Sequence, residues 1–220
     1  FEKTSTRTRC AFEVAAADEG ASVTFLDSAS SQMGKKESLA DTAKVLGRFY
    51  DGIEYRGYDQ QVVEDLAHHS GVPVWNGLTD VDHPTQALAD IMTIKENIKK
   101  PLNQVKLVFC GDIRNNVAYA LMYICAKLGL DYVGYGPPAL SPAPEVLACC
   151  EQMARESGTG ASFTITDDLR ALQGADALYT DIWASMGEED KIAERVKLLT
   201  PFRVNPELMA QTHNPQCIFL

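Results

Sequence analysis

The chain has 220 residues and a formal net charge of −10, with 45% hydrophobic and 23% charged residues. These values are typical of a soluble globular protein of one or two domains, and the negative charge makes nucleic acid and anionic membranes poor partners. The longest apolar run, at 117–126, is too short to span a bilayer.

The spacing of apolar residues predicts alternating helices and strands in the first part of the chain. A helix is expected to begin near Ser5 and to end at Gly20, and a strand is expected at 22–26. The apolar positions from Leu39 to Phe49 mark one face of a second helix. Further along, the pattern predicts strands at 53–56 and 72–75 and helices at 59–68 and 86–98.

Residues 99–103 interrupt this pattern with two lysines, a proline and an asparagine, so we expect domains at 1–100 and 101–220. In the second domain, the pattern predicts strands at 106–110, 132–135, 162–166 and 177–180, and helices at 115–128, 145–157 and 189–199. Strands that alternate with helices form parallel sheets covered on both faces. The expected fold class is α/β, with two lobes that each hold a parallel sheet flanked by helices and an active site in the cleft between them.

The six cysteines form no C-x-x-C pair and show no zinc-ligand spacing, and the acidic residues show no metal cluster. Cys10, Cys110 and Cys125 lie in apolar patterns, so we expect small core residues there. This cysteine usage fits a reducing, cytoplasmic location. The chain begins with Phe1 inside a motif and ends on a strand-like segment at 217–220, so we expect a fragment of a longer protein.

Hydroxyls and guanidiniums alternate at 5–9 (Ser-Thr-Arg-Thr-Arg), directly before the first helical pattern. Hydroxyls cap a helix start, and the free N–H groups and dipole of that start favour anions. Guanidinium groups bind phosphate oxygens two at a time. The segment therefore predicts a phosphate site, and a capped surface helix with two solvated arginines is the open alternative.

Polar residues follow several predicted strands, at the ends where parallel sheets bind ligands. Arg56 follows the strand at 53–56, and His83 follows the strand at 72–75 through a short loop. Two further clusters stand at 111–116 and 181–188. Each has a simpler interpretation: His83 as a loop residue, and Asn115, Asn116, Asp181 and Ser185 as helix caps. No G-x-G-x-x-G, nucleoside-triphosphate loop or nucleophile elbow is present.

Together these motifs resemble the ornithine carbamoyltransferases, a branch of the transcarbamylase family, over the whole chain. Residues 5–9 and 83–86 (His-Pro-Thr-Gln) are similar to the carbamoyl-phosphate motifs of all transcarbamylases. Motifs similar to the ornithine-specific ones stand at 1–3 (Phe-Glu-Lys), 31–38 (Ser-Gln-Met-Gly-Lys-Lys-Glu-Ser), 76–80 (Asn-Gly-Leu-Thr-Asp) and 181–188 (Asp-Ile-Trp-Ala-Ser-Met-Gly-Glu). The family's His-Cys-Leu-Pro motif, which supplies an ornithine-facing cysteine, does not occur in this chain.

The resemblance implies transfer of a carbamoyl group from carbamoyl phosphate to the δ-amine of L-ornithine, giving L-citrulline and phosphate in arginine metabolism. It implies no metal and no organic cofactor. It makes Thr8, Arg56 and His83 the catalytic donors to the carbonyl oxygen. It assigns carbamoyl phosphate to Ser5, Thr6, Arg7, Thr8, Gln32, Arg56, His83 and Gln86, and ornithine to Asn116, Asp181, Ser185 and Met186.

The resemblance also implies a homotrimer or a higher homo-oligomer, because the family's loop that contains Gln32 reaches into a neighbouring subunit. From the residues alone, that segment is a plain surface loop. Three other functions stay open: a transcarbamylase for putrescine, acetylornithine or aspartate, a nicotinamide-dependent dehydrogenase, and a binding protein without catalysis. The missing glycine fingerprint argues against the dehydrogenase, and the carboxylate in 181–188 favours a basic amino acid as acceptor.

Overall fold

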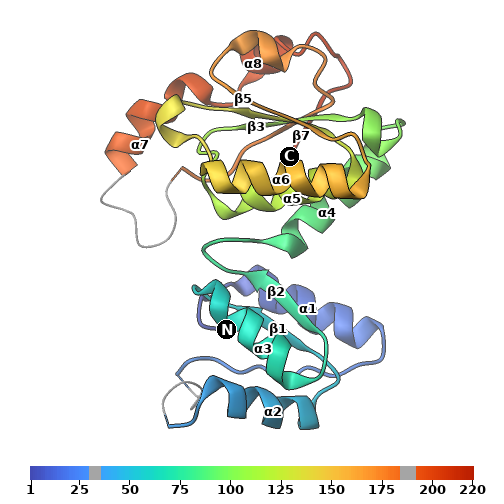
Figure 1. The fold of residues 1–220 in the computed structure, drawn as a ribbon, viewed down its shortest axis with the longest axis vertical. Coiled ribbons are helices and arrows are strands. Elements are labelled where there is room, and N and C mark those ends of the chain that lie inside the picture. The colour runs from blue at the N-terminus through green and yellow to red at the C-terminus, as the bar shows by residue number, and fades with distance from the viewer. Residues whose placement is uncertain (30–35, 184–191) are drawn as a thin grey trace. The chain divides into compact units, whose positions relative to one another are not determined.

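A computed structural model describes residues 1–29, 36–183 and 192–220. The chain divides into two compact units, Phe1–Thr85 and Gln86–Leu220 (Figure 1). Each unit contains a parallel sheet with helices packed on it, which confirms the expected α/β class. The expected domains at 1–100 and 101–220 stay a prediction.

The first unit is built on a pair of parallel strands. Its elements are α1 (Thr6–Asp18), α2 (Leu39–Phe49), β1 (Ile53–Arg56), α3 (Gln60–Ser70) and β2 (Val74–Leu78). Strand β1 pairs with β2, and the register shifts between Tyr55 and Arg56. Its small core consists of Ala43, Tyr55, Val63 and Leu66.

The strand expected at 22–26 is wrong, because the structure has irregular chain there. Neither β1 nor β2 pairs with this segment, so among the described residues it has no strand partner, and a strand needs one. The end of the segment and the residues after it instead bond to Phe1: the Phe1 amino group donates to the Leu26 carbonyl at 2.9 Å, and the Ser28 amide donates to the Phe1 carbonyl at 3.3 Å. Val23 is therefore 46% exposed.

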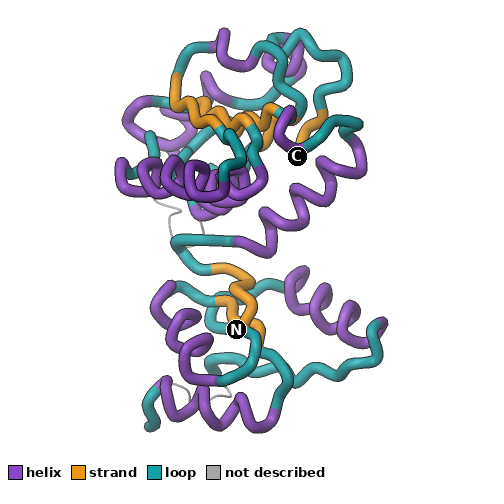
Figure 2. Tube along the Cα trace, turned by 45° about the vertical axis from the view of Figure 1, so that its right-hand side comes forward, coloured by secondary structure: helices purple, strands orange, loops and turns teal. Residues whose placement is uncertain are grey.

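The second unit contains a five-stranded parallel sheet in the order β5-β4-β3-β6-β7. Figure 2 shows helices on both sides of its strands. The strands are β3 (Lys106–Cys110), β4 (Asp131–Tyr135), β5 (Ser162–Thr166), β6 (Ala177–Tyr179) and β7 (Ile218–Phe219). The helices are α4 (Pro84–Asn97), α5 (Asn116–Leu128), α6 (Pro144–Ser157), α7 (Ile192–Leu199) and α8 (Pro206–Ala210). Short 3-10 turns lie at Leu102–Gln104, Pro138–Leu140, Leu169–Leu172 and Thr200–Phe202.

Alternation along β3 divides the core of this unit into two layers. Leu107 and Phe109 pack with residues of α4, α5 and α6 on one face of the sheet. Val108 and Cys110 pack on the other face, in a cluster that includes Leu208 of α8. Because both faces are covered, β3 is an almost continuous apolar run, as parallel strands usually are.

Most predicted elements are confirmed within one or two residues. The expected helix at 189–199 appears as α7, with its first three positions outside the described residues. Cys110 and Cys125 are buried as expected, but Cys10 is exposed. That prediction is wrong because α1 buries none of its residues in this structure. No helix among the described residues is long and apolar enough to cross a membrane.

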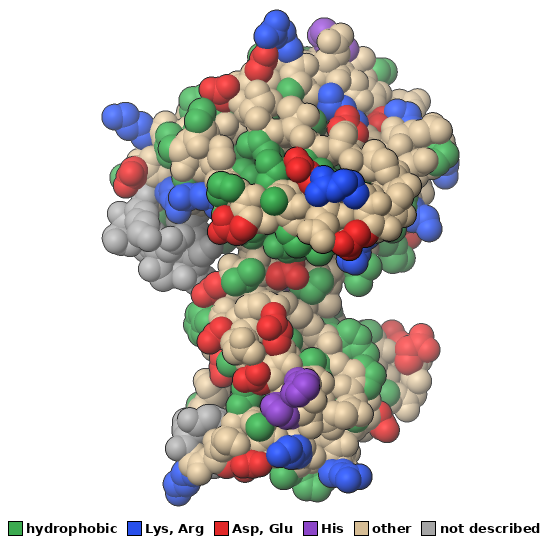
Figure 3. All heavy atoms as spheres, in the orientation of Figure 1, with side chains coloured by type: hydrophobic (Ala, Val, Ile, Leu, Met, Phe, Trp, Pro, Cys, Tyr) green, Lys and Arg blue, Asp and Glu red, His purple; other side chains and the backbone are tan. Residues whose placement is uncertain are grey.

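The face seen in Figure 3 carries acidic and basic side chains interspersed with uncharged ones. A net charge of −10 on such a mixed surface leaves little general attraction for polyanions. Any anion site must therefore be a local group of cations.

Candidate active site

Segments from the two ends of the first unit meet at Arg56, the last residue of β1. The backbone amides of Glu2 and Lys3 donate to the Arg56 carbonyl at 2.8 and 3.3 Å. The buried Lys3 ammonium pairs with Asp80 at 3.1 Å, and the Tyr55 hydroxyl donates to the Glu2 carboxylate at 2.8 Å. The motifs at 1–3 and 76–80, far apart in sequence, therefore support the same strand end.

The start of α1 is capped by its own hydroxyls. The Ser5 Oγ accepts from the Thr8 amide at 3.3 Å and donates to the Thr8 Oγ1 at 3.1 Å. Arg9 is engaged elsewhere, since it pairs with Glu13 at 2.8 Å and lies 3.8 Å over the Phe25 ring. Arg7 is exposed and has no ion pair among the described residues. The cap predicted from sequence is present, and it leaves Arg7 available to an anion.

Arg56 is a buried cation with only part of its donor set satisfied. Its side chain donates from Nη1 to the Gly77 carbonyl at 3.2 Å, while its Nε has no partner among the described residues. Burial and the charge of Arg7 lower the Arg56 pKa, and Glu54 opposes them. A buried N–H without a partner is costly, so an acceptor supplied by a ligand would stabilise this side chain.

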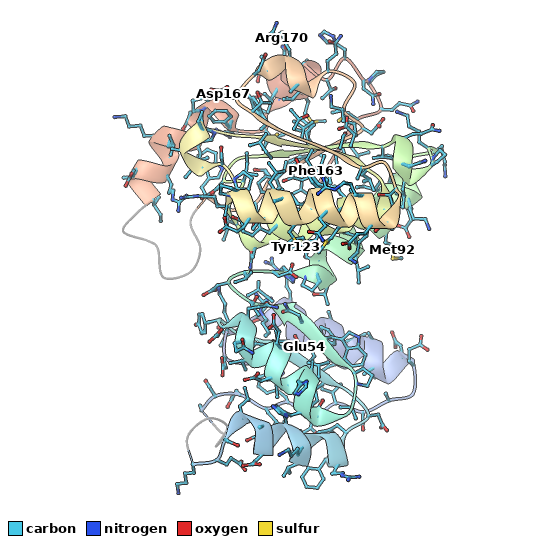
Figure 4. The ribbon with its side chains drawn as sticks, viewed as in Figure 1. Glu54, Met92, Tyr123, Phe163, Asp167 and Arg170 are labelled. Carbon is cyan, nitrogen blue, oxygen red and sulfur yellow. The ribbon has the colours of Figure 1, made fainter. Side chains whose placement is uncertain are left out.

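Glu54 stands two residues earlier on β1 (Figure 4). Burial raises its pKa to about 7, although the positive charges of the chain's amino group and of Arg56 favour the ionised form. Its Oε1 has no hydrogen-bonding partner among the described residues. Glu54 is therefore only a partial counter-charge for Arg56 near neutral pH.

His83 is held neutral beside the same guanidinium. Burial and the charge of Arg56 lower the His83 pKa to about 4. Its Nδ1 lies 3.4 Å from the Thr85 hydroxyl. At neutral pH the ring can donate one hydrogen bond but carries no positive charge. Arg7, Arg56 and His83 thus form a group of two cations and a neutral donor within the first unit.

Gln86 opens the second unit, on the first turn of α4. Its Nε2 donates to the Asp90 Oδ1 at 2.9 Å, one helical turn further along. Burial and the charge of Asp181 raise the Asp90 pKa. The Gln86 amide and the Tyr179 hydroxyl lower it. The sequence did not identify Asp90 or Tyr179 as candidate site residues. The four-residue spacing from Gln86 to Asp90 is nevertheless the spacing of an interacting pair on a helix.

Asp181 follows β6 and is partly buried. Its Oδ1 accepts from the Ile182 amide at 2.7 Å, and its Oδ2 lies 3.5 Å from the Asn115 Nδ2. Burial raises its pKa. Asn115 also caps α5, accepting from the Ala118 amide at 2.7 Å, which confirms the helix-cap interpretation for that residue. Asn116 is the first residue of α5.

The two units thus hold two separate sets of predicted site residues. The first unit groups Ser5, Thr6, Arg7, Thr8, Arg56 and His83, and the second holds Gln86, Asn116 and Asp181. Gln32, Ser185 and Met186 lie outside the described residues. In the described ranges, no three His, Cys, Asp or Glu side chains are placed to hold a metal ion.

Two family models match the chain. The model described as "Aspartate/ornithine carbamoyltransferase, carbamoyl-P binding domain" matches residues 1–96. The model described as "Aspartate/ornithine carbamoyltransferase, Asp/Orn binding domain" matches residues 103–220. The first match contains the cationic group, and the second contains Asn116 and Asp181.

Curated relatives and solved structures resemble the chain along its whole length. It is 58% identical to a catabolic ornithine carbamoyltransferase of Clostridium perfringens and 55% identical to one of Haemophilus influenzae. In each case 100% of this chain aligns, but it spans only 66% of the relative. The structure of the Pyrococcus furiosus ornithine carbamoyltransferase matches with a TM-score of 0.90 at 46% identity, covering 99% of this chain and 68% of that one. An anabolic enzyme of that name from Campylobacter jejuni matches with a TM-score of 0.89 at 33% identity, covering 100% and 71%.

Proposed function

The chain belongs to the aspartate/ornithine carbamoyltransferase family, and on that premise we propose that the whole protein carbamoylates L-ornithine. Carbamoyl phosphate donates the carbamoyl group, and the products are L-citrulline and phosphate. The observation that carries the proposal is the group formed by Arg7, Arg56 and the neutral His83 in the unit that matches the carbamoyl-phosphate model. The names of relatives at 55–58% identity support ornithine as the acceptor.

The phosphate is held at the start of α1. Ser5, Thr6 and Thr8 supply hydroxyls and backbone N–H groups there, where the helix dipole favours an anion. Arg7 adds a guanidinium that matches two phosphate oxygens at once. Neutralising this phosphate makes it a better leaving group. Gln32 completes the set by resemblance.

The carbonyl oxygen of carbamoyl phosphate gains negative charge when the amine attacks the carbon. Arg56, His83 and Thr8 donate hydrogen bonds to that oxygen. Such donors stabilise the tetrahedral intermediate, and losing one typically costs about 10²–10³ in rate. The neutral state of His83 suits a donor of this kind, because it keeps its proton throughout.

The δ-nitrogen of ornithine forms the new bond to the carbamoyl carbon. The bond from that carbon to the phosphate oxygen then breaks and its electron pair leaves with the phosphate. The attacking nitrogen gives up one proton, which goes to the departing phosphate. Asp181 supplies a negative charge for an amino group of ornithine, and Asn116, Ser185 and Met186 hold the rest of it. The Gln86 side-chain oxygen accepts from the carbamoyl NH₂.

The acceptor is tested directly with the whole protein. Citrulline formation from ornithine is compared with carbamoyl transfer to putrescine, N-acetylornithine and aspartate at equal concentrations. We expect ornithine to give the highest kcat/KM, and a higher value for any of the other three would replace ornithine as the substrate. The word "catabolic" in the names of several relatives supports a role in arginine breakdown, which citrulline phosphorolysis at physiological phosphate would test.

The proposed assembly is a homotrimer or a higher homo-oligomer, supported by family membership. The proposed location is the cytoplasm, supported by six free cysteines of the kind that a reducing compartment maintains. Sedimentation of the whole protein tests the assembly. A monomer that is fully active would contradict it.

A further inference from the structure

Asp90 lies on the buried side of α4, one turn after Gln86. It is 5% exposed and lies in the stripe that also contains Ala87, Ile91 and Ile94. Met92, on the opposite side of the same helix, is 63% exposed (Figure 4). A carboxylate in such a stripe is unusual, because charged side chains are rarely buried without a specific partner.

That partner is the Gln86 amide. The Gln86 Nε2 donates to the Asp90 Oδ1 at 2.9 Å. An ionised carboxylate can only accept hydrogen bonds, whereas an amide has a donor end and an acceptor end. Asp90 therefore selects one of the two orientations of the Gln86 amide, with the nitrogen toward Asp90 and the oxygen turned away from it.

Tyr179 of β6 lies close to the same carboxylate. Its hydroxyl and the Gln86 amide lower the Asp90 pKa, but burial is the largest influence and the pKa is raised overall. Among the described residues, the Asp90 Oδ2 is buried without a hydrogen-bonding partner, so the Gln86 Nε2 is the donor on which this carboxylate depends. The two side chains therefore hold each other in place within the buried stripe.

We propose that Asp90 is a positioning residue that fixes the Gln86 amide with its oxygen available to the carbamoyl NH₂ of the substrate. The consequence is selectivity: the site prefers carbamoyl phosphate to acyl phosphates that carry a methyl group in place of the NH₂. This inference rests on the proposed function, in which Gln86 accepts from that NH₂.

The test compares carbamoyl phosphate with acetyl phosphate in the whole protein. Asp90→Asn keeps the size of the side chain but offers both a donor and an acceptor, so the Gln86 amide can take either orientation. We expect kcat/KM for carbamoyl phosphate to fall by about tenfold, the size of one lost hydrogen bond of roughly 1.4 kcal/mol. The inhibition constant of acetyl phosphate should stay unchanged, because acetyl phosphate has no N–H to lose.

Asp65→Asn is the matched control. Gln61 Nε2 donates to Asp65 Oδ1 at 2.9 Å in α3, with the same four-residue spacing and on the solvent side of the helix. That variant should change neither constant. If Asp65→Asn lowered kcat/KM for carbamoyl phosphate as much as Asp90→Asn does, the proposal would be overturned. The effect would then belong to any Gln–Asp pair with this spacing on a helix.

Two further variants separate positioning from a structural role. In a Gln86→Ala background, Asp90→Asn should add no further loss of selectivity, because residues that act through one another are not additive. The proposal would be overturned if Asp90→Asn weakened the use of carbamoyl phosphate and the binding of acetyl phosphate equally. It would also be overturned if the losses of selectivity in the two single variants multiplied in the double variant. If Asp90→Asn does not fold, Gln86→Ala alone decides: unchanged selectivity in that variant rules out the role of Asp90.

The wild-type rate distinguishes this inference from the proposed function. A whole protein that forms no citrulline overturns the function and the inference together. An active wild type with unchanged selectivity in Asp90→Asn overturns the inference alone.

Discussion

His83 is partly buried beside Arg56, and this burial together with the charge of that guanidinium lowers the pKa of His83 to about 4. The ring is therefore neutral at physiological pH. It can donate a hydrogen bond to a developing oxyanion, but it has no extra proton to give as a general acid.

This relationship predicts the titration of His83. In the folded whole protein, its ring resonance, assigned by comparison with His83→Gln, should titrate with a midpoint near 4. The folded pKa lies below the unfolded value of about 6.5, so the unfolded state binds more protons between the two values and stability should rise with pH across that window. A midpoint near the unfolded value would contradict the neutral donor.

The two arginines of the 5–9 motif should respond differently to substitution. Arg7→Lys keeps the charge but loses the planar fork that matches phosphate, so we expect kcat/KM for carbamoyl phosphate to fall by at least about tenfold. Arg9→Lys is the control, because Arg9 is already paired with Glu13 and lies over Phe25. Equal losses in the two variants would mean that the motif acts through helix stability and not through phosphate.

Attack by a neutral amine should give the rate of carbamoyl transfer a pH dependence of its own. A lysine-like amine has a pKa of about 10.4, so its neutral fraction rises about tenfold per pH unit well below that value. At subsaturating ornithine, turnover by the whole protein should rise with nearly that slope between about pH 7 and 8.5. A flat profile over that window would show that the protein binds the charged amine and removes its proton after binding.

Asp176 should be a strong determinant of stability in the second unit. The residue is 3% exposed, and its carboxylate accepts from the Lys106 amide at 3.0 Å, the Lys100 ammonium at 2.6 Å and the Asn214 amide at 3.3 Å. Asp176→Ala removes the acceptor of the Lys106 amide and the counter-charge of Lys100, and we expect a loss of about 3 kcal/mol in the free energy of unfolding.

Urea unfolding of the whole protein measures this loss. The control is Asp168→Ala, because Asp168 pairs with the well-exposed Arg170 and exposed pairs contribute little. A midpoint shift for Asp168→Ala that equals the shift for Asp176→Ala would contradict the importance of burial.

Local patterns predicted most of the fold. Strands β3 and β5 have the expected bounds because turn residues flank their short runs. The strand expected at 22–26 is wrong because strand formation depends on a partner elsewhere in the chain, which local sequence does not reveal. Helix α8 was missed because five residues are too few for a period, although Asn205 before Pro206 is a helix-start signal.

The candidate site also has local features that the sequence predicts and long-range features that it does not. The Ser5 cap and the Asn115 cap are local, so sequence could predict them. The mutual influence of Arg7 and Arg56 joins residues from two distant elements, and only the fold reveals it. The local pattern also could not show that Asp90 accepts from Gln86 in a buried stripe, because burial depends on how the whole unit packs.

The central claim is carbamoyl transfer to ornithine, and isotope transfer tests it most directly. The whole protein is incubated with ornithine and carbamoyl phosphate that carries carbon-13 in the carbamoyl group, and label and phosphate are followed in one sample by NMR. We predict that the label appears in citrulline in an amount equal to the phosphate released. Phosphate release without labelled citrulline, or no release at all, would contradict the claim.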